Sequence, residues 1–254
     1  MDHDKALTLF DHQMRQHPRG GERVDDVVRQ TGTGGDWNGV VWSGLDHDTA
    51  DAAIAGQVRF FASLGCDFEW KLYGYDRPDD LGARLRAAGF TPEPDETVMV
   101  AEIRELPTRA DLPEGVRLLS VTDPAGVDLV ADVHEQAFGT SSARLREQLL
   151  AQLAQSPDTV TMTVAMVGDL PVCAARMELH PGTEFASLWG GGTLAAWRGR
   201  GIYRALIAHR ARIAAANGYR FLQVDASDQS RPILQRLGFV PLTTTTPYVY
   251  EQRP

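Results

Sequence analysis

The chain has 254 residues, a length that fits one large domain or two compact ones. Hydrophobic residues make up 43% of it and charged residues 23%, which excludes the collagen-like and intrinsically disordered classes. The formal net charge of −9 argues against binding to nucleic acid or to an anionic membrane through the overall charge of the protein. We therefore expect neither as a partner, and we expect any anion site to be local.

The two cysteines, Cys66 and Cys173, have no CxxC or Cys/His spacing, so neither a disulfide framework nor a metal site is expected. The sequence contains no run of 18 uncharged apolar residues. Its start, MDHDKALTLFDHQMRQ, has neither the apolar core of a signal peptide nor the acid-poor composition of a transit peptide. These features predict a cytoplasmic protein.

In the first half, apolar periodicity predicts a helix over 52–65, a strand over 68–76, a helix over 80–90 and a strand around 98–100. The same order returns late in the chain. The repeated set is a helix at 204–218, a strand at 219–227, a helix at 229–239 and a strand around 248–250. Both shorter helices end in Gly-Phe, and they lie 149 residues apart. This repeat indicates two related domains.

Further elements are expected between the two repeats. They are a strand at 115–120, helices at 123–138 and 141–155, and strands at 159–167, 172–179 and 185–192. The helix that opens the second repeat is expected to begin before the repeated segment, so that it spans about 202–217. The order of these elements is typical of a mixed α/β layer architecture. The segment 105–114, which contains two prolines, reads as a linker between domain 1–104 and domain 115–254.

The most informative segment is Arg198-Gly199-Arg200-Gly201, between the expected strand at 185–192 and the helix that begins at Ile202. Glycines let the backbone approach a bulky anion, and the free N–H groups and dipole at a helix start favour negative charge. From 198 to 236 the chain has eight arginines and two aspartates, a net charge of +6 in a protein whose total is −9. The segment therefore predicts a local site for a cofactor that carries a pyrophosphate.

Two other phosphate motifs can be compared with this segment. A P-loop is excluded because GxxxxGK[ST] is absent. A dinucleotide-binding GxGxxG can be tried on Gly199 and Gly201, but Arg204 occupies its third glycine position. Three expected strands also precede the loop, whereas the dinucleotide motif normally opens its sheet. A nicotinamide dinucleotide stays a minor alternative ligand.

Residues 198–203, RGRGIY, resemble the R/Q-x-x-G-x-G/A motif of the GCN5-related N-acetyltransferases (GNAT). The segment 233–239, ILQRLGF, resembles the later helix of that family, which ends in Gly-Phe. The resemblance covers 115–254 and implies an α/β fold of two tandem GNAT-like domains, each a mixed, mostly antiparallel β-sheet flanked by helices. Because the first half has the acidic segment GLDHDTADAAI in place of the Arg-Gly loop, we expect its domain to be degenerate.

The resemblance implies acetyl-CoA (coenzyme A) as cofactor. Its pyrophosphate would lie on the backbone of 199–203, and its pantetheine beside the strand end at 193–195. The implied cofactor-binding residues are Thr193, Leu194, Ala195, Arg198, Gly199, Arg200, Gly201, Ile202, Tyr203 and Ser230. In the family a backbone N–H of that strand end polarises the thioester carbonyl, and Thr193 and Leu194 match its position.

The implied activity is transfer of an acetyl group from acetyl-CoA to a primary amine of a small molecule, directly within a ternary complex. The amine arrives as an ammonium ion and must lose a proton before it attacks. Glu178 and Glu184 flank the hairpin that enters the loop strand and are the candidate bases, although both also fit a role as solvated acids at strand ends. His134 and His180 are weaker candidates.

The sequence departs from the family pattern at two positions. The family usually has a tyrosine, acting as acid toward the leaving thiolate, at the place of Leu234. The proton donor would then be Tyr250 or another group such as Tyr248, Ser230 or water, or the thiolate would leave unassisted. Tyr203 stands where the loop motif ends in a small residue. These departures leave open an acyl-CoA-binding module without turnover as the second hypothesis.

Trp189 and the three glycines at 190–192 have two interpretations. Trp189 can line an acceptor pocket with the glycines making room beside it. It can equally be a core aromatic residue next to a β-bulge. The sequence does not identify the acceptor, and a monomer and a homodimer are both compatible with it.

Overall fold

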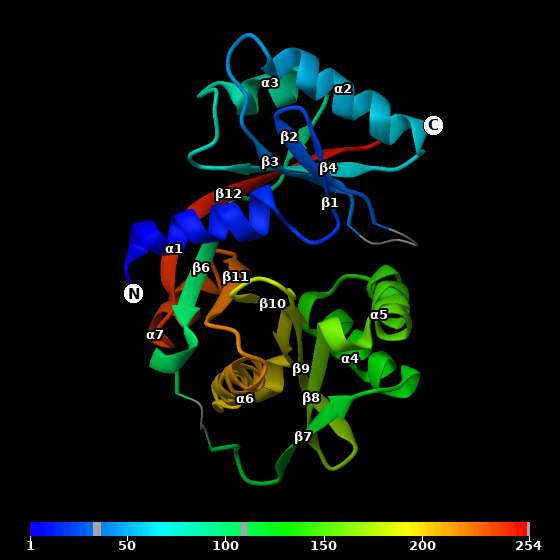
Figure 1. The fold of residues 1–254 in the computed structure, drawn as a ribbon. Coiled ribbons are helices and arrows are strands. Elements are labelled where there is room, and N and C mark those ends of the chain that lie inside the picture. Colours follow the sequence, from blue (N-terminus) through cyan, green and yellow to red (C-terminus); the bar gives the residue numbers. More distant parts are fainter. Residues whose placement is uncertain (33–36, 108–110, 253–254) are drawn as a thin grey trace. The chain divides into compact units, whose positions relative to one another are not determined.

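The computed structural model describes residues 1–32, 37–107 and 111–252 (Figure 1). These residues form two compact units. The first contains residues 1–99, 225–233 and the segment from 241 onwards, and the second contains 100–224 and 234–240. Part of the expected linker, residues 108–110, lies outside the described residues.

The first unit is built on a sheet with the strand order β1-β2-β3-β4-β12. Its elements are α1 (His3–Phe10), η1 (Asp11–Gln16), β1 (Gly21–Val24), β2 (Val27–Gln30), β3 (Gly39–Ser43), α2 (Ala50–Ser63), β4 (Phe68–Tyr73), α3 (Leu81–Ala87), β5 (Thr91–Pro92) and β12 (Val240–Tyr250). The strands pair antiparallel except for β3 and β4, which are parallel. Four of the described elements have residues in both units: β6 (Glu96–Glu102), β11 (Phe221–Ala226), α7 (Arg231–Arg236) and β12.

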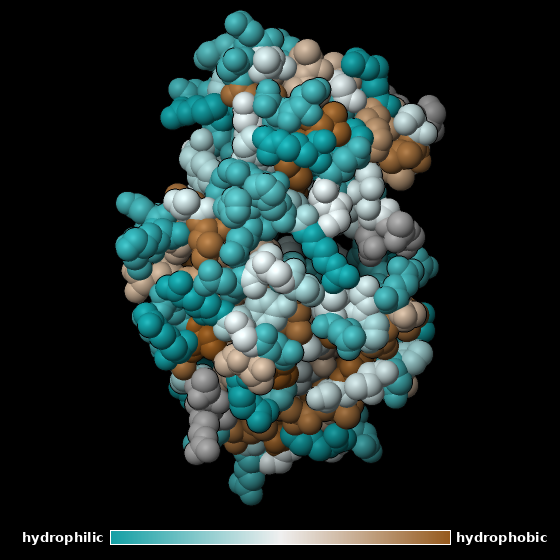
Figure 2. All heavy atoms as spheres, viewed as in Figure 1, coloured by the Kyte–Doolittle hydropathy of each residue, from teal (hydrophilic) through white to brown (hydrophobic). Residues whose placement is uncertain are grey.

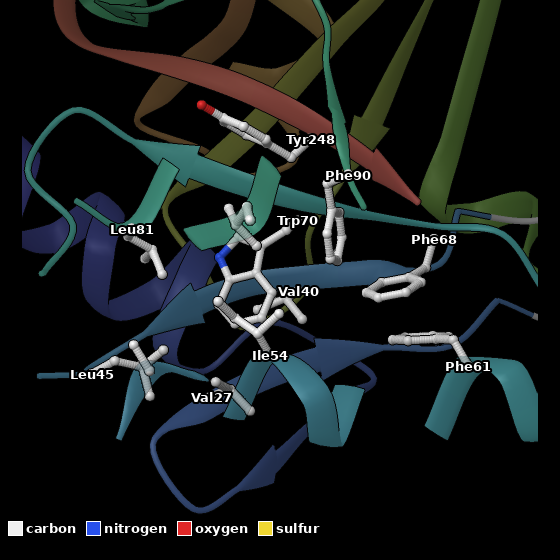
Figure 3. Packing of buried hydrophobic residues seen from close by; sticks show 12 residues of the cluster. Val27, Val40, Leu45, Ile54, Phe61, Phe68, Trp70, Leu81, Phe90 and Tyr248 are labelled. Carbon is white, nitrogen blue, oxygen red and sulfur yellow. The ribbon is translucent and has the colours of Figure 1, made fainter. Parts of the chain in front are cut away.

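Helix α2 covers the core of the first unit because its buried residues recur at helical spacing. Ala50, Ile54, Gln57 and Phe61 are all buried and share one face of the helix. The ring of Phe61 stacks on Phe68 of β4, with the centroids 4.3 Å apart (Figure 3). The fully buried Trp70 lies in the same core. This packing, rather than helix propensity alone, stabilises α2.

The second unit has a sheet with the order β7-β8-β9-β10-β11. Its elements are β7 (Val116–Val121), α4 (Pro124–Phe138), α5 (Ala143–Gln155), β8 (Val160–Val167), β9 (Leu170–Leu179), β10 (Phe185–Thr193), α6 (Ile202–Ala216) and β11 (Phe221–Ala226), with the short helices η2 (Ile103–Glu105), η3 (Pro157–Thr159) and η4 (Ala195–Trp197). Strands β7 to β10 are antiparallel, and β10 pairs parallel with β11.

Helices cover both faces of this sheet, which Figure 1 shows for α4 and α5 against α6. Successive side chains of a strand point to opposite faces. Val164 of β8 and Ala174 of β9 accordingly join the cluster under α4 and α5. Their neighbours Ala165 and Cys173 join the cluster under α6. The expected mixed, mostly antiparallel sheet flanked by helices is confirmed here.

The two units have other bounds than the expected domains 1–104 and 115–254, because the first unit ends at residue 99 and also contains 225–233 and the segment from 241 onwards. Residues 245–250 of β12 pair antiparallel with 73–68 of β4 and so belong with the first unit. Pairing between strands far apart in the sequence decides this membership, and periodicity within one strand cannot reveal it. No helix in the described part of the chain is long and apolar enough to span a membrane. Figure 2 shows hydrophobic residues interspersed with hydrophilic ones over the visible face.

Candidate functional site

Strand β10 leaves its neighbour β11 after a short paired stretch. Phe185, Ala186 and Ser187 pair with Phe221, Leu222 and Gln223, and this register includes no later residue of β10. On its other edge β10 stays paired with β9 as far as Thr193. The edge of β10 that faced β11 is therefore open to other partners from about Leu188 onward.

A β-bulge lies in the middle of β10. Trp189 pairs with Arg176 and Gly192 pairs with Ala174, so β10 holds one residue more than β9 between these two pairs. Gly190 has a φ of +57°, a left-handed conformation that glycine adopts at no steric cost. The glycines at 190–192 therefore form a bulge, while Trp189 also lines the pocket described below.

The end of β10 separates the two residues predicted to polarise a thioester. The N–H of Leu194 donates to the carbonyl of Val172 at 3.0 Å, so it faces β9 and already has an acceptor. Backbone groups alternate along a strand, so the N–H of Thr193 points to the opposite edge. The hydroxyl of Thr193 lies 3.0 Å from Cys173 Sγ. Of the two, only Thr193 has an N–H on the edge that β11 leaves.

The Arg198–Gly201 loop follows β10 and η4 and lies on the surface. Arg198, Gly199 and Arg200 are exposed, and Gly201 is partly exposed. Gly199 and Gly201 have φ values of +75° and +83°. A Cβ atom on Gly199 would meet no atom within 4 Å, so the space above the loop is open. The two glycines thus allow the left-handed backbone of the loop and leave room for a bulky group.

The two arginines of the loop have different surroundings. Arg198 Nε donates to the Thr193 carbonyl at 3.1 Å, and its Nη2 donates to the Ala137 carbonyl at 3.3 Å. Arg198 therefore holds the loop against the end of β10 and α4. The guanidinium of Arg200 lies over the ring of Trp197, 4.5 Å from its centroid. An exposed cation–π contact of this kind contributes only about 0.5–1 kcal/mol, so Arg200 can move to an anion.

Helix α6 begins directly after the loop. Its first intrahelical bond runs from Ala205 N–H to the Gly201 carbonyl at 3.0 Å, so the N–H groups of residues 202–204 precede the regular ladder. The side chain of Ile202 is buried in the core beneath the sheet. The Tyr203 ring lies against Gly191, and burial raises the pKa of its hydroxyl. Tyr203 thus fills space under the bulge.

The predicted catalytic residues do not gather at the loop. Glu184 precedes β10, at the end opposite the loop, and a nine-residue strand spans roughly 30 Å. Its carboxylate pairs with Arg220 at 3.4 Å. Glu178 lies on β9 opposite Ser187, within 3.4 Å of both Arg176 and Gln152. Their catalytic roles stay predictions.

Two more predicted residues belong to the first unit. The ring of Tyr250 packs with Phe90 and Phe68 at centroid distances of 5.1 and 5.7 Å. Ser230 lies in a turn in which its N–H and its hydroxyl both donate to the Ser227 carbonyl. Leu234, at the position of the family tyrosine, is in the second unit and fully buried.

A pocket of about 190 Å³ lies between α4, α5 and the bulged part of the sheet. It is lined by Val130, His134, Leu145, Leu149, Arg176, Trp189 and Gly190. The buried Nε of Arg176, Nε1 of Trp189 and Nδ1 of His134 have no hydrogen-bond partner among the residues that the structure describes. Mostly apolar pockets with a few convergent polar groups are typical ligand sites.

No functional role is predicted for Arg176 from the sequence, and His134 is only a weaker candidate base there. Arg176 sits in the strand 172–179, whose other side chains are mostly apolar and buried. An arginine inside such a strand indicates a functional site, because arginine is seldom buried without a partner for its charge. Nothing in the sequence, however, places it beside His134 of α4 or Trp189 of β10.

No family model and no curated protein matches the chain. Solved structures do match it over nearly its whole length. A GCN5-related N-acetyltransferase from Kribbella flavida is 16% identical with a TM-score of 0.71, and the match covers 99% of this chain and 96% of that one. A functionally unknown conserved protein from Staphylococcus epidermidis ATCC 12228 is 15% identical with a TM-score of 0.73 and coverages of 98% and 100%.

A third match is a tandem GNAT protein from the clavulanic acid biosynthesis pathway. It is 13% identical with a TM-score of 0.62, and the match covers 93% of this chain and 85% of that one. Identities this low show the shared fold alone. Together with the loop and sheet geometry, these similarities confirm the fold that the sequence predicted: the chain has the fold of the GCN5-related N-acetyltransferases, including their tandem form.

Proposed function

We propose that this protein is an acetyl-CoA-dependent N-acetyltransferase that transfers the acetyl group directly to a primary amine of a small molecule within a ternary complex. The observation that carries the proposal is the exposed Arg198–Gly201 loop at the start of α6. Two left-handed glycines, orphan N–H groups and an arginine at a 15-residue helix suit a diphosphate. The N-terminal GNAT-like domain is proposed to be degenerate and without such a loop.

The space above Gly199 and Gly201 is open enough for the diphosphate of coenzyme A. A Cβ on Gly199 would point into open space, and one on Gly201 would meet only the guanidinium of Arg204 at 3.6 Å. We assign the diphosphate to the backbone of 199–203 and to Arg200. The pantetheine is assigned to the strand end at Thr193, Leu194 and Ala195. Ser230 stays a cofactor-binding residue predicted from the sequence alone.

When bound, acetyl-CoA would supply an activated acetyl group: the neutral amine nitrogen would form the amide bond as the C–S bond breaks, and CoA would leave as the thiol with a proton that this nitrogen gives up. The Thr193 N–H would donate to the thioester carbonyl, a role worth several kcal/mol for a fixed donor. His134 accepts the proton of the ammonium ion. Burial and the charge of Arg176 lower the pKa of His134, which favours the neutral imidazole that can accept a proton.

Two measurements test the proposal. Calorimetry should detect acetyl-CoA binding to the wild type, and Arg200→Glu should weaken it by at least about tenfold, because a charge-assisted bond is replaced by repulsion. Arg144→Glu is the matched control, since Arg144 is an exposed arginine on α5. Release of free CoA with a panel of primary amines then measures turnover. Equal acetyl-CoA affinity in all three proteins would contradict the assigned loop.

A second candidate function is an acyl-CoA-binding module without turnover. It is favoured by Leu234, a fully buried aliphatic side chain where the family usually has an acidic tyrosine hydroxyl. This hypothesis predicts tight acetyl-CoA binding with no CoA release from any amine of the panel. Detectable release that depends on an amine would rule it out.

A further inference from the structure

The pocket between α4, α5 and the bulge of β10 is lined by two residues whose side chains carry buried, unpaired hydrogen-bond donors. Arg176 Nε–H and Trp189 Nε1–H can only donate, and neither has a partner among the described residues. Leaving a buried donor unpaired is costly, so such groups in native structures call for an explanation. Here both belong to residues directly opposite each other on neighbouring strands.

The arginine is poorly satisfied by protein groups. The ion pair from its Nη2 to Glu178 is 3.4 Å long, beyond the usual range for a strong charge-assisted bond. Its guanidinium lies 5.6 Å from the centroid of the Trp189 indole. A planar guanidinium with a free Nε–H beside an indole N–H suits an acceptor with two oxygens, and a carboxylate is the simplest such group.

The rest of the pocket is apolar. Among its lining residues, Val130 and Leu149 are buried and Leu145 is partly buried. The volume of about 190 Å³ exceeds the roughly 150 Å³ of an engineered apolar cavity that holds benzene. The ligand therefore has a small apolar body in addition to its charged group.

Building on the proposed function, we infer that this pocket binds the carboxylate end of the acceptor, which is an amino acid or a similar small carboxylate-bearing amine with an apolar side chain. The carboxylate accepts from Arg176 Nε–H and Trp189 Nε1–H. The apolar body lies against Val130, Leu145 and Leu149, and the amine lies toward His134, whose Nδ1 is also unpaired among the described residues.

Binding is tested first without any amine, so that this result does not depend on catalysis. The probes are 4-methylpentanoate and its amide, titrated into the wild type and followed by calorimetry or NMR. Only the carboxylate should bind, and Arg176→Met should weaken it by about 10- to 100-fold through loss of a charged donor. Arg144→Met, which removes an exposed arginine of α5, is the matched control and should bind as the wild type does.

If Arg176→Met does not fold, Trp189→Phe replaces it, because this variant keeps a ring and removes only the N–H. It should weaken the binding of 4-methylpentanoate by about 2- to 10-fold, which is the effect of losing one neutral hydrogen bond. Equal binding of the acid and the amide, or binding that neither variant changes, would overturn the assignment.

Turnover separates this inference from the proposed function. L-Leucine should be acetylated with a higher kcat/KM than L-leucinamide or 3-methylbutylamine. Carboxylate binding that Arg176→Met abolishes, combined with no acetylation of any amine, would support the pocket and refute the N-acetyltransferase. Equal kcat/KM for all three amines would support the N-acetyltransferase and refute the carboxylate pocket.

Discussion

Lys71 of β4 and Asp225 form a buried ion pair in the first unit, and breaking it should destabilise that unit strongly. Their side chains are 14% and 4% exposed, and Lys71 Nζ donates to Asp225 Oδ2. Removing one partner of a buried pair costs roughly 3–5 kcal/mol, because it leaves a desolvated charge behind. For a total stability of about 5–15 kcal/mol, Lys71→Met should leave the unit marginally folded.

Urea unfolding of four proteins measures this effect: the wild type, Lys71→Met, Asp225→Asn and the double variant. The double variant should be more stable than Lys71→Met, because it has no unpaired buried carboxylate. In thermal unfolding of the same proteins, each kcal/mol of lost stability lowers the Tm by about 2–4 °C, so Lys71→Met should lower it by roughly 6–20 °C. A double variant no more stable than Lys71→Met would refute the reasoning, since no charge coupling would then exist.

Three further changes have defined outcomes. Gly199→Ala and Gly168→Ala both place a Cβ at positive φ in open space, so each should lower stability by about 1–2 kcal/mol, but only Gly199→Ala should also weaken acetyl-CoA binding in calorimetry. Leu234→Tyr should destabilise the protein by about 1–3 kcal/mol through overpacking and so lower its Tm, whereas an unchanged Tm would show that the site has spare room. Burial raises the pKa of Glu69, so the native state holds this proton to higher pH than the unfolded chain does. Wild-type stability in urea should therefore fall relative to Glu69→Gln as the pH rises from about 4.5 through the raised pKa, whereas parallel pH profiles would contradict this.

The sequence predicts most of the second unit correctly because its elements have strong periodicity and clear ends. The helix expected over 202–217 is found as Ile202–Ala216, and the one expected over 123–138 as Pro124–Phe138. Asp123 caps the latter by accepting from the Gly126 N–H at 2.8 Å. Such local signals suffice to predict a helix where the sequence itself marks both of its ends.

The strands of the first unit are harder to predict from the sequence because the early ones are short. Gly21–Val24 has no buried residue, so no alternation marks it as β1. The strand expected around 248–250 is the end of the 11-residue β12, and its partner β4 lies more than 170 residues away in the sequence. Long-range pairing of this kind leaves no trace in local periodicity.

The candidate site is predictable in its loop and hidden in its pocket. Glycines and arginines at a strand-to-helix turn indicate an anion site through backbone physics alone. The pocket, in contrast, unites His134 of α4 with Arg176 of β9 and Trp189 of β10. Only tertiary packing brings these three side chains together, and the β10 bulge that shapes the pocket is visible only in the strand register.

In the proposed function, the backbone amides at the start of α6 bind the diphosphate of coenzyme A. An amide NMR titration of the full chain with acetyl-CoA tests it most directly. The largest shifts should fall on Gly199 and on residues 201–204, and Arg144→Glu should leave them unchanged. Shifts confined to residues 1–99, or no shift at the loop at saturating acetyl-CoA, would contradict the claim.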